Sequence, residues 1–479
     1  MTSTTCIRNA ACVVAWDTTN RRHAYLMGGD VAFTGDTLCF VGSHYDGAVD
    51  TEINGTNLMV MPGLIDLHSH PSTEPFYRGV REEHGVPAMY MSGLYERSVA
   101  FQPDAIARRA GKRVAFCEML LSGVTSVADL SGIDEGWIDI AAQSGLRVFL
   151  APSFASARWH LENGWALKYR WDETAGRRGL DAALALIAQA ETHPSGRLAG
   201  IVSPAQVDTC SIDLLRDSFA AAKMHNVPLT VHCAQSVNEF LVMVDRHGKS
   251  PVQFARDIDI LSPRTVLGHA MFIDEHSWVR WHTRTDLAIL AATGTHVAHC
   301  PSPFGRYGHT LEDFGRYGRA GVNLGIGTDV APHNVIEEMR LAAILARVAA
   351  RDITTTSIGA LFHAATAGGA DALGRPDLGR LAVGAKADLV LVDLANRWMR
   401  PARDPLRSLI FTAADRAVRT VFVHGIKVSD QGRVLTMDHE AALAAVAEGQ
   451  ARMLRDAPSR DWAGRSAEQI SPLSLPMLG

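Results

Sequence analysis

Two histidines separated by a single residue, His68 and His70, end the apolar segment MPGLIDLHSH at residues 61–70. Residues two apart on a β-strand point to the same face, so both imidazoles would lie on one side of such a strand. Two imidazoles on one face can bind one divalent metal ion, and in a barrel of parallel strands that face looks inward. A lone pair of this kind is more often chance or packing, so a metal site needs further ligands elsewhere.

Three more groups with suitable chemistry follow apolar, strand-like segments. His232 follows PLTV, His269 follows TVLG, and Asp329 follows VNLGIGT. The ends of parallel barrel strands meet at one mouth, so these side chains are expected beside the first two histidines. Each alone would be read as a hydrogen-bonded structural residue, but five in this order predict a metal centre. Imidazole and carboxylate ligands suit Zn²⁺, and Fe²⁺, Mn²⁺ or Co²⁺ also fit.

The elements that must position these groups change character along the chain. Between residues 62 and 380, strand-like and helix-like segments alternate, as at 134–144 and 146–151. This alternation predicts an α/β fold, a TIM-like (β/α)8 barrel. Residues 1–61 and 381–479 instead carry short β-branched segments with glycine turns. Neither end could cover a sheet face alone, so we expect them to form one small composite β-sandwich domain, with a C-terminal helix.

The amino-acid composition limits the kinds of partner that this protein is expected to bind. The 479 residues carry a net charge of −5, with 47% hydrophobic and 20% charged residues, so a large core can be buried. No basic run predicts a nucleic-acid partner, and no apolar run reaches the roughly 18 residues of a membrane span. The start has no signal-peptide pattern, and the seven scattered cysteines form no CxxC pair. We therefore expect a cytoplasmic protein with a small-molecule substrate.

Eight segments together resemble the atrazine/triazine-hydrolase and guanine/cytosine-deaminase-like branch of the amidohydrolase superfamily. They are MPGLIDLHSH (61–70), PAQVDTCS (204–211), VHCAQSVNE (231–239), GHAMFIDE (268–275), VAHCPSP (297–303), GTDVAPHNVIEEMRLAA (327–343), AATAGGADALG (364–374) and LAVGAKADLVLVD (381–393). The resemblance covers nearly the whole chain. It also implies a homo-oligomer, because the family leans to dimers or larger assemblies.

By this resemblance the metal ligands are His68, His70, His232 and Asp329, holding one divalent ion, with zinc as the first choice. His269 would not bind the metal but would hydrogen-bond the attacking water or the substrate carbonyl. No lysine lies in the fourth-strand segment 198–204, which argues against a binuclear centre bridged by a carbamylated lysine.

The chain departs from this branch at Gln235. Deaminases of the branch usually carry a glutamate three residues after the fifth-strand histidine, and that glutamate moves a proton to a ring nitrogen. A glutamine amide does not titrate and cannot be a general acid or base. Either Gln235 is neutral drift or Glu239 substitutes for the missing acid, although Glu239 is expected in the next helix. Ala205 likewise replaces a histidine that commonly faces the substrate.

These departures favour a metal-dependent hydrolase that cleaves a C–N bond of an amide-, urea- or carbamate-like small molecule. Asp329 would accept the proton of the attacking water and pass it to the leaving nitrogen, His269 would stabilise the oxyanion, and Gln235 would orient water or substrate. The alternative is an aminohydrolase, a deaminase or triazine-type hydrolase, acting on an N-heterocycle. A non-catalytic relative is the third possibility. Retention of all the predicted ligands weighs against it.

The substrate pocket is expected in the loops that follow the barrel strands. Aromatic side chains there could hold a flat substrate between them. The opposing interpretation is that most of these residues only pack the barrel rim. The candidates are Glu74, Arg78, Trp159, His160 and Phe304.

Overall fold

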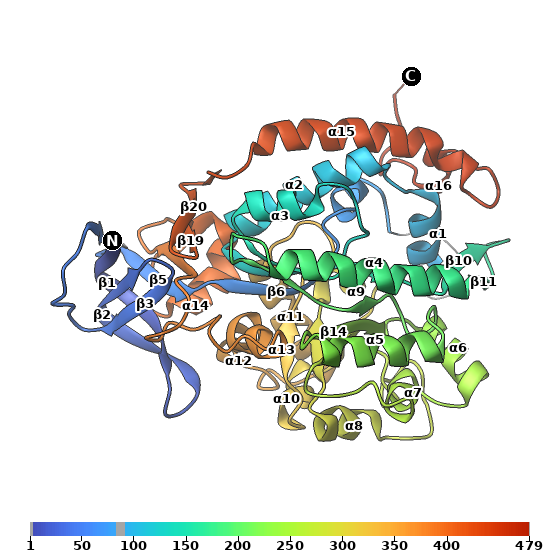
Figure 1. The fold of residues 1–479 in the computed structure, drawn as a ribbon, viewed down its shortest axis with the longest axis horizontal. Coiled ribbons are helices and arrows are strands. Elements are labelled where there is room, and N and C mark those ends of the chain that lie inside the picture. Colours follow the sequence, from blue (N-terminus) through green and yellow to red (C-terminus); the bar gives the residue numbers. More distant parts are fainter. Residues whose placement is uncertain (1–2, 83–91, 479) are drawn as a thin grey trace.

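The computed structural model describes residues 3–82 and 92–478. Both ends of the chain contribute to one nine-stranded sheet, with the order β21-β20-β19-β18-β5-β1-β2-β3 and with β4 beside β1. The junction is the antiparallel pair β5 and β18, in which Pro62 is opposite Leu389. Figure 1 shows the blue N-terminal strands beside the red C-terminal ones at one end of the molecule. The two ends therefore meet, as expected from the sequence.

The strands of this sheet come in two groups along the chain. They are β1 (Thr4–Asp17), β2 (Arg22–Thr34), β3 (Thr37–Gly42), β4 (Thr51–Asn54), β5 (Leu58–Pro62), β18 (Leu389–Asp393), β19 (Val418–Val423), β20 (Ile426–Asp430) and β21 (Arg433–Val434).

Eight further strands build the centre of the molecule as two four-stranded parallel sheets. Isolated parallel bridges join the two sheets at both edges, Val202 to Leu229 and Ser69 to Asp329. The strands thus close into a ring, and the expected TIM-like barrel is confirmed. In order round the ring they are β6 (Leu64–Ser69), β7 (Val124–Asp129), β8 (Arg147–Leu150), β12 (Leu198–Gly200), β14 (Leu229–Cys233), β15 (Thr265–His269), β16 (His296–His299) and β17 (Leu324–Ile326).

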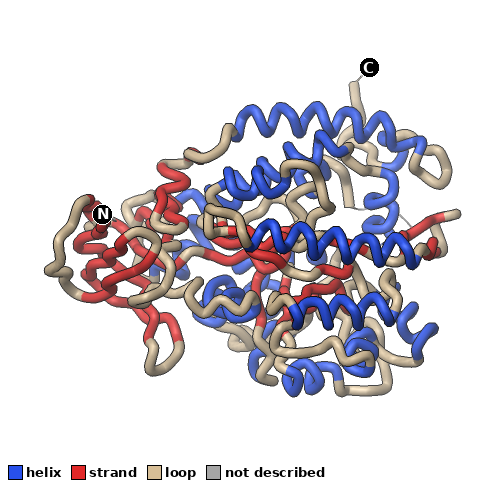
Figure 2. The backbone as a smooth tube through the Cα atoms, viewed as in Figure 1, coloured by secondary structure: helices blue, strands red, loops and turns tan. Residues whose placement is uncertain are grey.

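Helices follow the barrel strands and surround them, so the strands occupy the centre of the view in Figure 2. Because the sheet is covered on both faces, its strands are buried along their whole length, and β6 and β14 are examples. The principal helices are α2 (Ala105–Leu121), α3 (Trp137–Ser144), α4 (Glu173–Glu191), α5 (Ile212–Met224), α6 (Val237–His247), α7 (Pro251–Asp257), α8 (Asp286–Thr293), α9 (Pro301–Arg306), α10 (Phe314–Arg319), α11 (Val335–Ala350) and α12 (Ile358–His363).

Side chains at the helix starts fix where several of these helices begin. Asp104, Asp172, Ser211 and Ser236 each accept a hydrogen bond from a backbone N–H in the first turn of the helix that follows. Asn334 does the same for α11, accepting from two N–H groups. The residues at which these helices begin are therefore fixed by side-chain hydrogen bonds.

Two elements lie outside this regular pattern. A hairpin of β10 (Ala157–Leu161) and β11 (Leu167–Trp171) stands over the barrel and packs on α1 (Ser92–Ala100), where Tyr95 meets Trp159 edge to face. The C-terminal helix α15 (His439–Asp456) packs along α2, as Figure 1 shows, and buries Val446 against Phe76 and Val114. The C-terminal helix thus covers the barrel wall.

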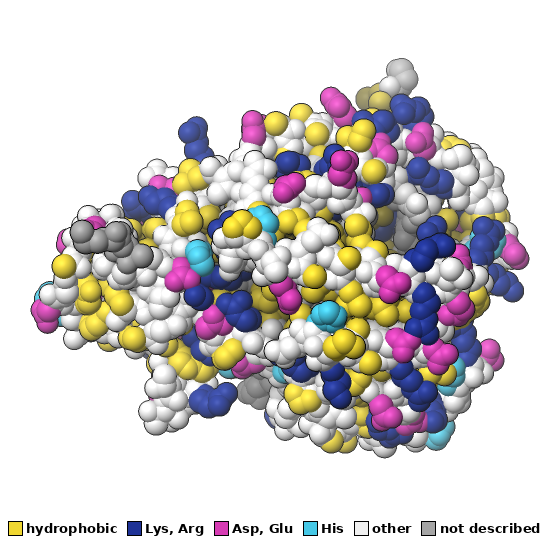
Figure 3. Space-filling model, viewed as in Figure 1, with side chains coloured by type: hydrophobic (Ala, Val, Ile, Leu, Met, Phe, Trp, Pro, Cys, Tyr) yellow, Lys and Arg dark blue, Asp and Glu magenta, His cyan; other side chains and the backbone are white. Residues whose placement is uncertain are grey.

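Lys and Arg side chains are interspersed with Asp and Glu on the face drawn in Figure 3. Within residues 3–82 and 92–478, no helix is both long and apolar enough to cross a membrane.

Candidate metal centre

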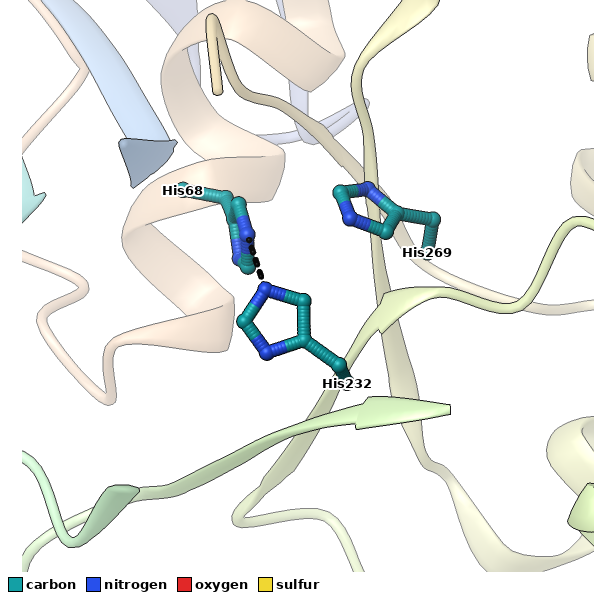
Figure 4. A group of neighbouring side chains, drawn as sticks. All are labelled: His68, His232 and His269. Atoms are coloured by element: carbon teal, nitrogen blue, oxygen red, sulfur yellow. Dashed lines mark hydrogen bonds between the residues drawn. The ribbon is translucent and has the colours of Figure 1, made fainter. Parts of the chain in front are cut away.

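Five side chains from four barrel strand ends converge on one point. The Nε2 atom of His232 lies 3.1 Å from Nε2 of His68 and 3.3 Å from Nε2 of His70. An Asp329 carboxylate oxygen lies 3.2 Å from Nε2 of His70 and 3.6 Å from that of His68. Figure 4 shows the rings of His68, His232 and His269 turned toward one another. The five residues that the sequence predicted to lie together are therefore neighbours in the structure.

These separations match those expected around a metal ion. In a tetrahedral zinc site with bonds of about 2.0–2.1 Å, neighbouring ligand atoms lie about 3.3 Å apart. Unprotonated nitrogens and a carboxylate oxygen at 3.1–3.6 Å form such a set of ligand atoms. Two overlapping groups, His68 with His232 and His269, and His68 with His70 and Asp329, each have ligand atoms close enough to hold one ion.

Backbone carbonyls orient two of the imidazoles. Nδ1–H of His70 donates to the Leu130 carbonyl at 2.9 Å, and Nδ1–H of His232 donates to that of Ala205 at 2.7 Å. A proton on Nδ1 leaves Nε2 with a free lone pair, which is the arrangement of a metal-binding histidine. The Asp329 backbone N–H donates to the His68 carbonyl at 2.8 Å, which fixes the carboxylate beside the histidine pair.

Burial sets the charge of the cluster. Burial and neighbouring histidines hold the pKa of His68 well below its usual value and lower the pKa of His232 to about 4. For His70 burial acts in the same direction, but the hydrogen bond and charge of Asp329 outweigh it and raise the pKa to about 9. The pKa of Asp329 falls well below its usual range despite burial, because the histidines surround it. His68 and His232 are therefore neutral and ready to bind a divalent cation, whereas His70, paired with Asp329, would release its proton when the cation binds.

His269 occupies a different position from the other three histidines. Its Nε2 lies 3.8 Å from an Asp329 oxygen, and its ring packs edge to face on Phe304 with centroids 4.6 Å apart. Both ring nitrogens are buried without a hydrogen-bond partner among the described residues. Burial lowers its pKa to about 3. Because neither ring nitrogen has a hydrogen-bond partner, His269 is free to bind water, substrate or the metal.

A cavity of about 340 Å³ opens above the cluster. Of the predicted substrate residues, Glu74, Trp159 and Phe304 line it, and so does Gln235. The lining also includes Arg97 and Gln206, which the sequence did not single out. Gln206 lies in the segment PAQVDTCS, directly after Ala205, so the sequence segment that predicts a substrate-facing position also contains Gln206. Arg97 lies on helix α1, far from any strand end, and no pattern marks it.

The predictions for Arg78 and His160 need correction, because neither residue lines the cavity. Arg78 forms an ion pair with Glu118 on the outer side of the wall. His160 is next to Trp159 on strand β10, where successive side chains point to opposite faces. Its Nε2 accepts a hydrogen bond from Arg170 at 2.8 Å across the hairpin. A loop was expected here, and the strand alternation separates the two neighbours.

Glu239 does not replace the missing acid at position 235. Its two carboxylate oxygens accept the backbone N–H groups of Ala234 and Gln235 at 2.6 and 2.7 Å. The side chain is buried, and burial and the nearby Asp208 raise its pKa to about 8. Since both oxygens hold the loop and the residue lies outside the cavity lining, Glu239 positions Gln235.

The chain is similar to known proteins over most of its length. A family model described as the amidohydrolase family matches residues 59–428. A 5-methylthioadenosine/S-adenosylhomocysteine deaminase of Natronomonas pharaonis is 28% identical over 88% of this chain and 93% of its own length. A 5'-deoxyadenosine deaminase of Methanosphaera stadtmanae is 27% identical over 82% and 87%. Both relatives thus align over most of their length.

Solved structures give the same result. The atrazine chlorohydrolase of Arthrobacter aurescens, complexed with zinc, superposes with a TM-score of 0.77 at 25% identity, covering 93% of this chain and all of that one. An adenosine deaminase from Xanthomonas campestris, with bound zinc, gives a TM-score of 0.78 at 23% identity over 94% and 98%, and supports the fold.

Proposed function

The chain belongs to the amidohydrolase family, and from this premise we propose that it is a metal-dependent hydrolase acting on an N-heterocycle, from which it displaces a substituent such as an amino group. The observation that carries the proposal is the cluster of three Nε2 atoms and one carboxylate oxygen at the base of a cavity, in which each atom lies 3.1–3.6 Å from two of the others. Such a set of ligands is the machinery for activating water.

A heterocyclic substrate has more support than the amide-, urea- or carbamate-like one expected first. The relatives named above are adenosine-type deaminases, and a structural neighbour at 25% identity is an atrazine chlorohydrolase. The cavity has aromatic walls, Trp159 on the hairpin and Phe304 beside His269, which suit a flat ring. These findings favour the second expectation, an aminohydrolase or triazine-type hydrolase.

The residues that would hold the metal are His68, His70, His232 and Asp329, and zinc is the first choice because the chlorohydrolase neighbour is a zinc complex. A divalent ion bound there would lower the pKa of water to about 7 and polarise the ring carbon's substituents. The remaining chemistry belongs to the chain's own side chains.

Asp329 would take the proton of the attacking water and return it to the departing group. The histidines around it lower its pKa, so the carboxylate is ionised when water binds. His269, with two unpartnered nitrogens, would donate a hydrogen bond to the oxygen that attacks the ring carbon. Gln235 would orient the substrate, and Glu74 with Arg97, 3.6 Å apart, would hold its far side.

We also propose the division of the chain and its setting. Residues 62–380 form the catalytic barrel, and residues 1–61 and 381–479 form a composite domain, a small β-sandwich whose C-terminal helix α15 packs on the barrel wall. The seven cysteines are all free, which supports a reducing compartment such as the cytoplasm. A homo-oligomer remains the expectation from the family.

A substrate panel tests the proposed function. Purines, pyrimidines, triazines, aryl ureas and carbamates would be incubated with the protein purified without chelator, and products identified by mass spectrometry with a separate assay for ammonia. We expect conversion of at least one heterocycle to the product in which oxygen replaces a ring substituent. Turnover confined to ureas and carbamates would contradict the proposal.

A further inference from the structure

Arg97, on helix α1, lines the cavity with a guanidinium that makes no hydrogen bond to the described residues. Its side chain is 6% exposed, and its Nε–H is buried without a partner. The carboxylate that faces it belongs to Glu74, whose Oε1 lies 3.6 Å from Nη2, too far for a hydrogen bond. A buried donor without an acceptor costs free energy, so such groups are normally paired. Arg97 therefore has room for acceptors that a ligand can supply.

The guanidinium of Arg97 is held in one orientation. Its Cζ lies 4.4 Å from the centroid of the Tyr77 ring, so one face of the group is covered. The Tyr77 hydroxyl donates to the Phe101 carbonyl at 3.0 Å, which fixes the ring beside the arginine. With one face stacked, the N–H groups along the edge of the guanidinium remain for a planar acceptor. Arginine binds a carboxylate in this way, through two parallel hydrogen bonds.

A second unpartnered donor lies close to Arg97. Tyr307 lines the same cavity, and its hydroxyl is buried with no hydrogen-bond partner in the described part of the chain. Burial raises the pKa of Tyr307, with the charge of Arg97 acting in the opposite direction, so the hydroxyl keeps its proton and can donate. Two donors without acceptors, on α1 and on the segment after α9, thus belong to one region of the cavity.

The charges around the cavity favour an anionic group there. Among the described lining residues, the arginines are Arg97 and Arg108. The carboxylates are Glu74 and Asp329. A divalent ion in the metal cluster adds two positive charges, so positive charge exceeds negative charge in the loaded cavity. Low-dielectric walls focus such a potential and attract a ligand of opposite sign.

We propose that the substrate is a heterocycle that carries a carboxylate, and that Arg97 and Tyr307 bind this carboxylate while the ring faces the metal cluster. The inference rests on the proposed function and names a subsite and a substrate class within it. A carboxylate fits better than a phosphate dianion, because Glu74, 3.6 Å from Arg97, already balances part of its charge. A cavity of about 340 Å³ has room for a ring with one short acidic side chain.

Arg108 provides a matched control, because it lines the same cavity with its donors in use. Its Nε donates to Asp134 at 2.9 Å, and its Nη2 lies 2.8 Å from the same carboxylate. Its Nη1 donates to the Pro103 carbonyl at 3.3 Å. Both arginines carry one positive charge, but Arg97 lacks such partners. A difference between Arg97→Met and Arg108→Met therefore reports a specific contact with the substrate, beyond the loss of one charge.

Matched substrates give the first test. The N-carboxymethyl derivatives of adenine, cytosine and melamine are each compared with the corresponding carboxamide, which has the same shape without the charge, and kcat/KM is measured with the zinc-loaded protein. For an accepted ring we expect the carboxylate to be favoured about 10- to 100-fold, the scale of a hydrogen bond to a charged group. Equal turnover of acid and amide would overturn the inference and leave the proposed function standing. Turnover of no heterocycle would defeat the proposed function.

Substitutions locate the site of recognition. Arg97→Met is expected to raise KM for the carboxylate about 10- to 100-fold and to abolish its advantage over the amide. Arg108→Met should change KM less than about threefold for either compound. Glu74→Gln is expected to lower KM for the carboxylate, since it removes the negative charge beside Arg97. An unchanged KM in Arg97→Met, or equal losses in the two arginine variants, would overturn the assignment.

A binding measurement gives a result that does not depend on turnover. Zinc-loaded protein is titrated calorimetrically with 9-carboxymethylhypoxanthine, which has no amine to lose. We expect Kd to rise about 10- to 100-fold in Arg97→Met and about 3- to 10-fold in Arg97→Lys, which keeps the charge without the paired donors and serves if the methionine variant does not fold. A carboxylate that binds only to the metal would give one Kd in wild type and in both Arg97 variants, and that result would contradict the proposed subsite.

Discussion

At the scale of single residues, the site combines a cluster of candidate metal ligands with a glutamine that does not titrate. His68 and His232 stay neutral because burial and the neighbouring histidines oppose their protonation, so their nitrogens are ready to bind a cation. Gln235 lies on the same cavity wall with no capacity to titrate. The candidate metal ligands can activate water, but Gln235 cannot protonate the substrate. Two tasks that one acid often performs are therefore separated in this site.

His269 provides a prediction at this scale. His269→Asn keeps a polar side chain but removes the imidazole that faces the cluster with two unpartnered nitrogens. We expect kcat on the best heterocycle to fall by about 10²–10³-fold, as for loss of an oxyanion donor, with metal content unchanged. Loss of the metal in this variant would show that His269 is a ligand.

At the scale of elements, strand ends and the loops after them set the geometry. Strands β6, β14 and β15 deliver the histidines at or just beyond their ends, and Ser236 fixes the start of the helix that follows Gln235. Close packing between neighbouring strands leaves no spare room. A β-carbon on Gly268 would lie 2.7 Å from Cε1 of His68, which is closer than such contacts allow.

Gly268→Ala therefore tests whether packing between β15 and β6 positions a ligand. The added methyl must push the His68 ring aside, and we expect metal affinity to fall about 10- to 100-fold, the usual cost of disturbing a ligand's support. Isothermal titration with Zn²⁺ measures it. Gly318→Ala, on α10 with open space around it, is the matched control. Equal affinity in the two variants would contradict this role.

At the scale of the whole molecule, a buried ion pair ties the barrel to the sheet formed by the chain ends. Arg147 on β8 donates through Nη2 to Asp388 at 3.1 Å and to Nδ1 of His424 at 3.1 Å. The Asp388 carboxylate also accepts the His424 backbone N–H at 2.7 Å. All this lies where β18 enters the sheet, so the pair fixes how the two parts of the chain meet.

Breaking this pair should cost stability more than activity. Arg147→Met leaves a buried carboxylate without its counter-ion, and we expect the free energy of unfolding to drop by about 3–5 kcal/mol. Urea denaturation followed by circular dichroism measures the loss. Adding Asp388→Asn should recover part of it, because the charge is removed and an acceptor remains. Arg177→Met, at a half-exposed pair with Asp217, should cost less than about 1 kcal/mol, and a similar loss in both would contradict this account.

Much of this architecture could be predicted from the sequence because its signals are local. Strand–helix alternation predicts the barrel, and the HxH motif with its later strand-end partners predicts the metal cluster. Arg97 could not be found in this way, because it reaches the cavity from a helix that tertiary packing folds over the barrel mouth. His160 was misplaced because the turn signal Asn163-Gly164 of its hairpin was overlooked, so the alternation of side chains along β10 was not considered.

The substrate was the hardest feature to predict. Gln235 suggested an amide-like carbonyl because the usual acid is missing, whereas the relatives favour a heterocycle. The hydrogen bond between Gln206 and Gln235 on the cavity wall is a further feature of the substrate site, and no sequence pattern shows it.

Metal stoichiometry tests the central claim most directly. Elemental analysis would be carried out on protein purified without chelator, on wild type and on the variants His68→Ala and Asp329→Asn. The cluster predicts about one divalent ion per chain in the wild type, and a loss of most of the metal and of heterocycle hydrolysis in both variants. Two ions per wild-type chain, or full metal content and activity in either variant, would contradict it.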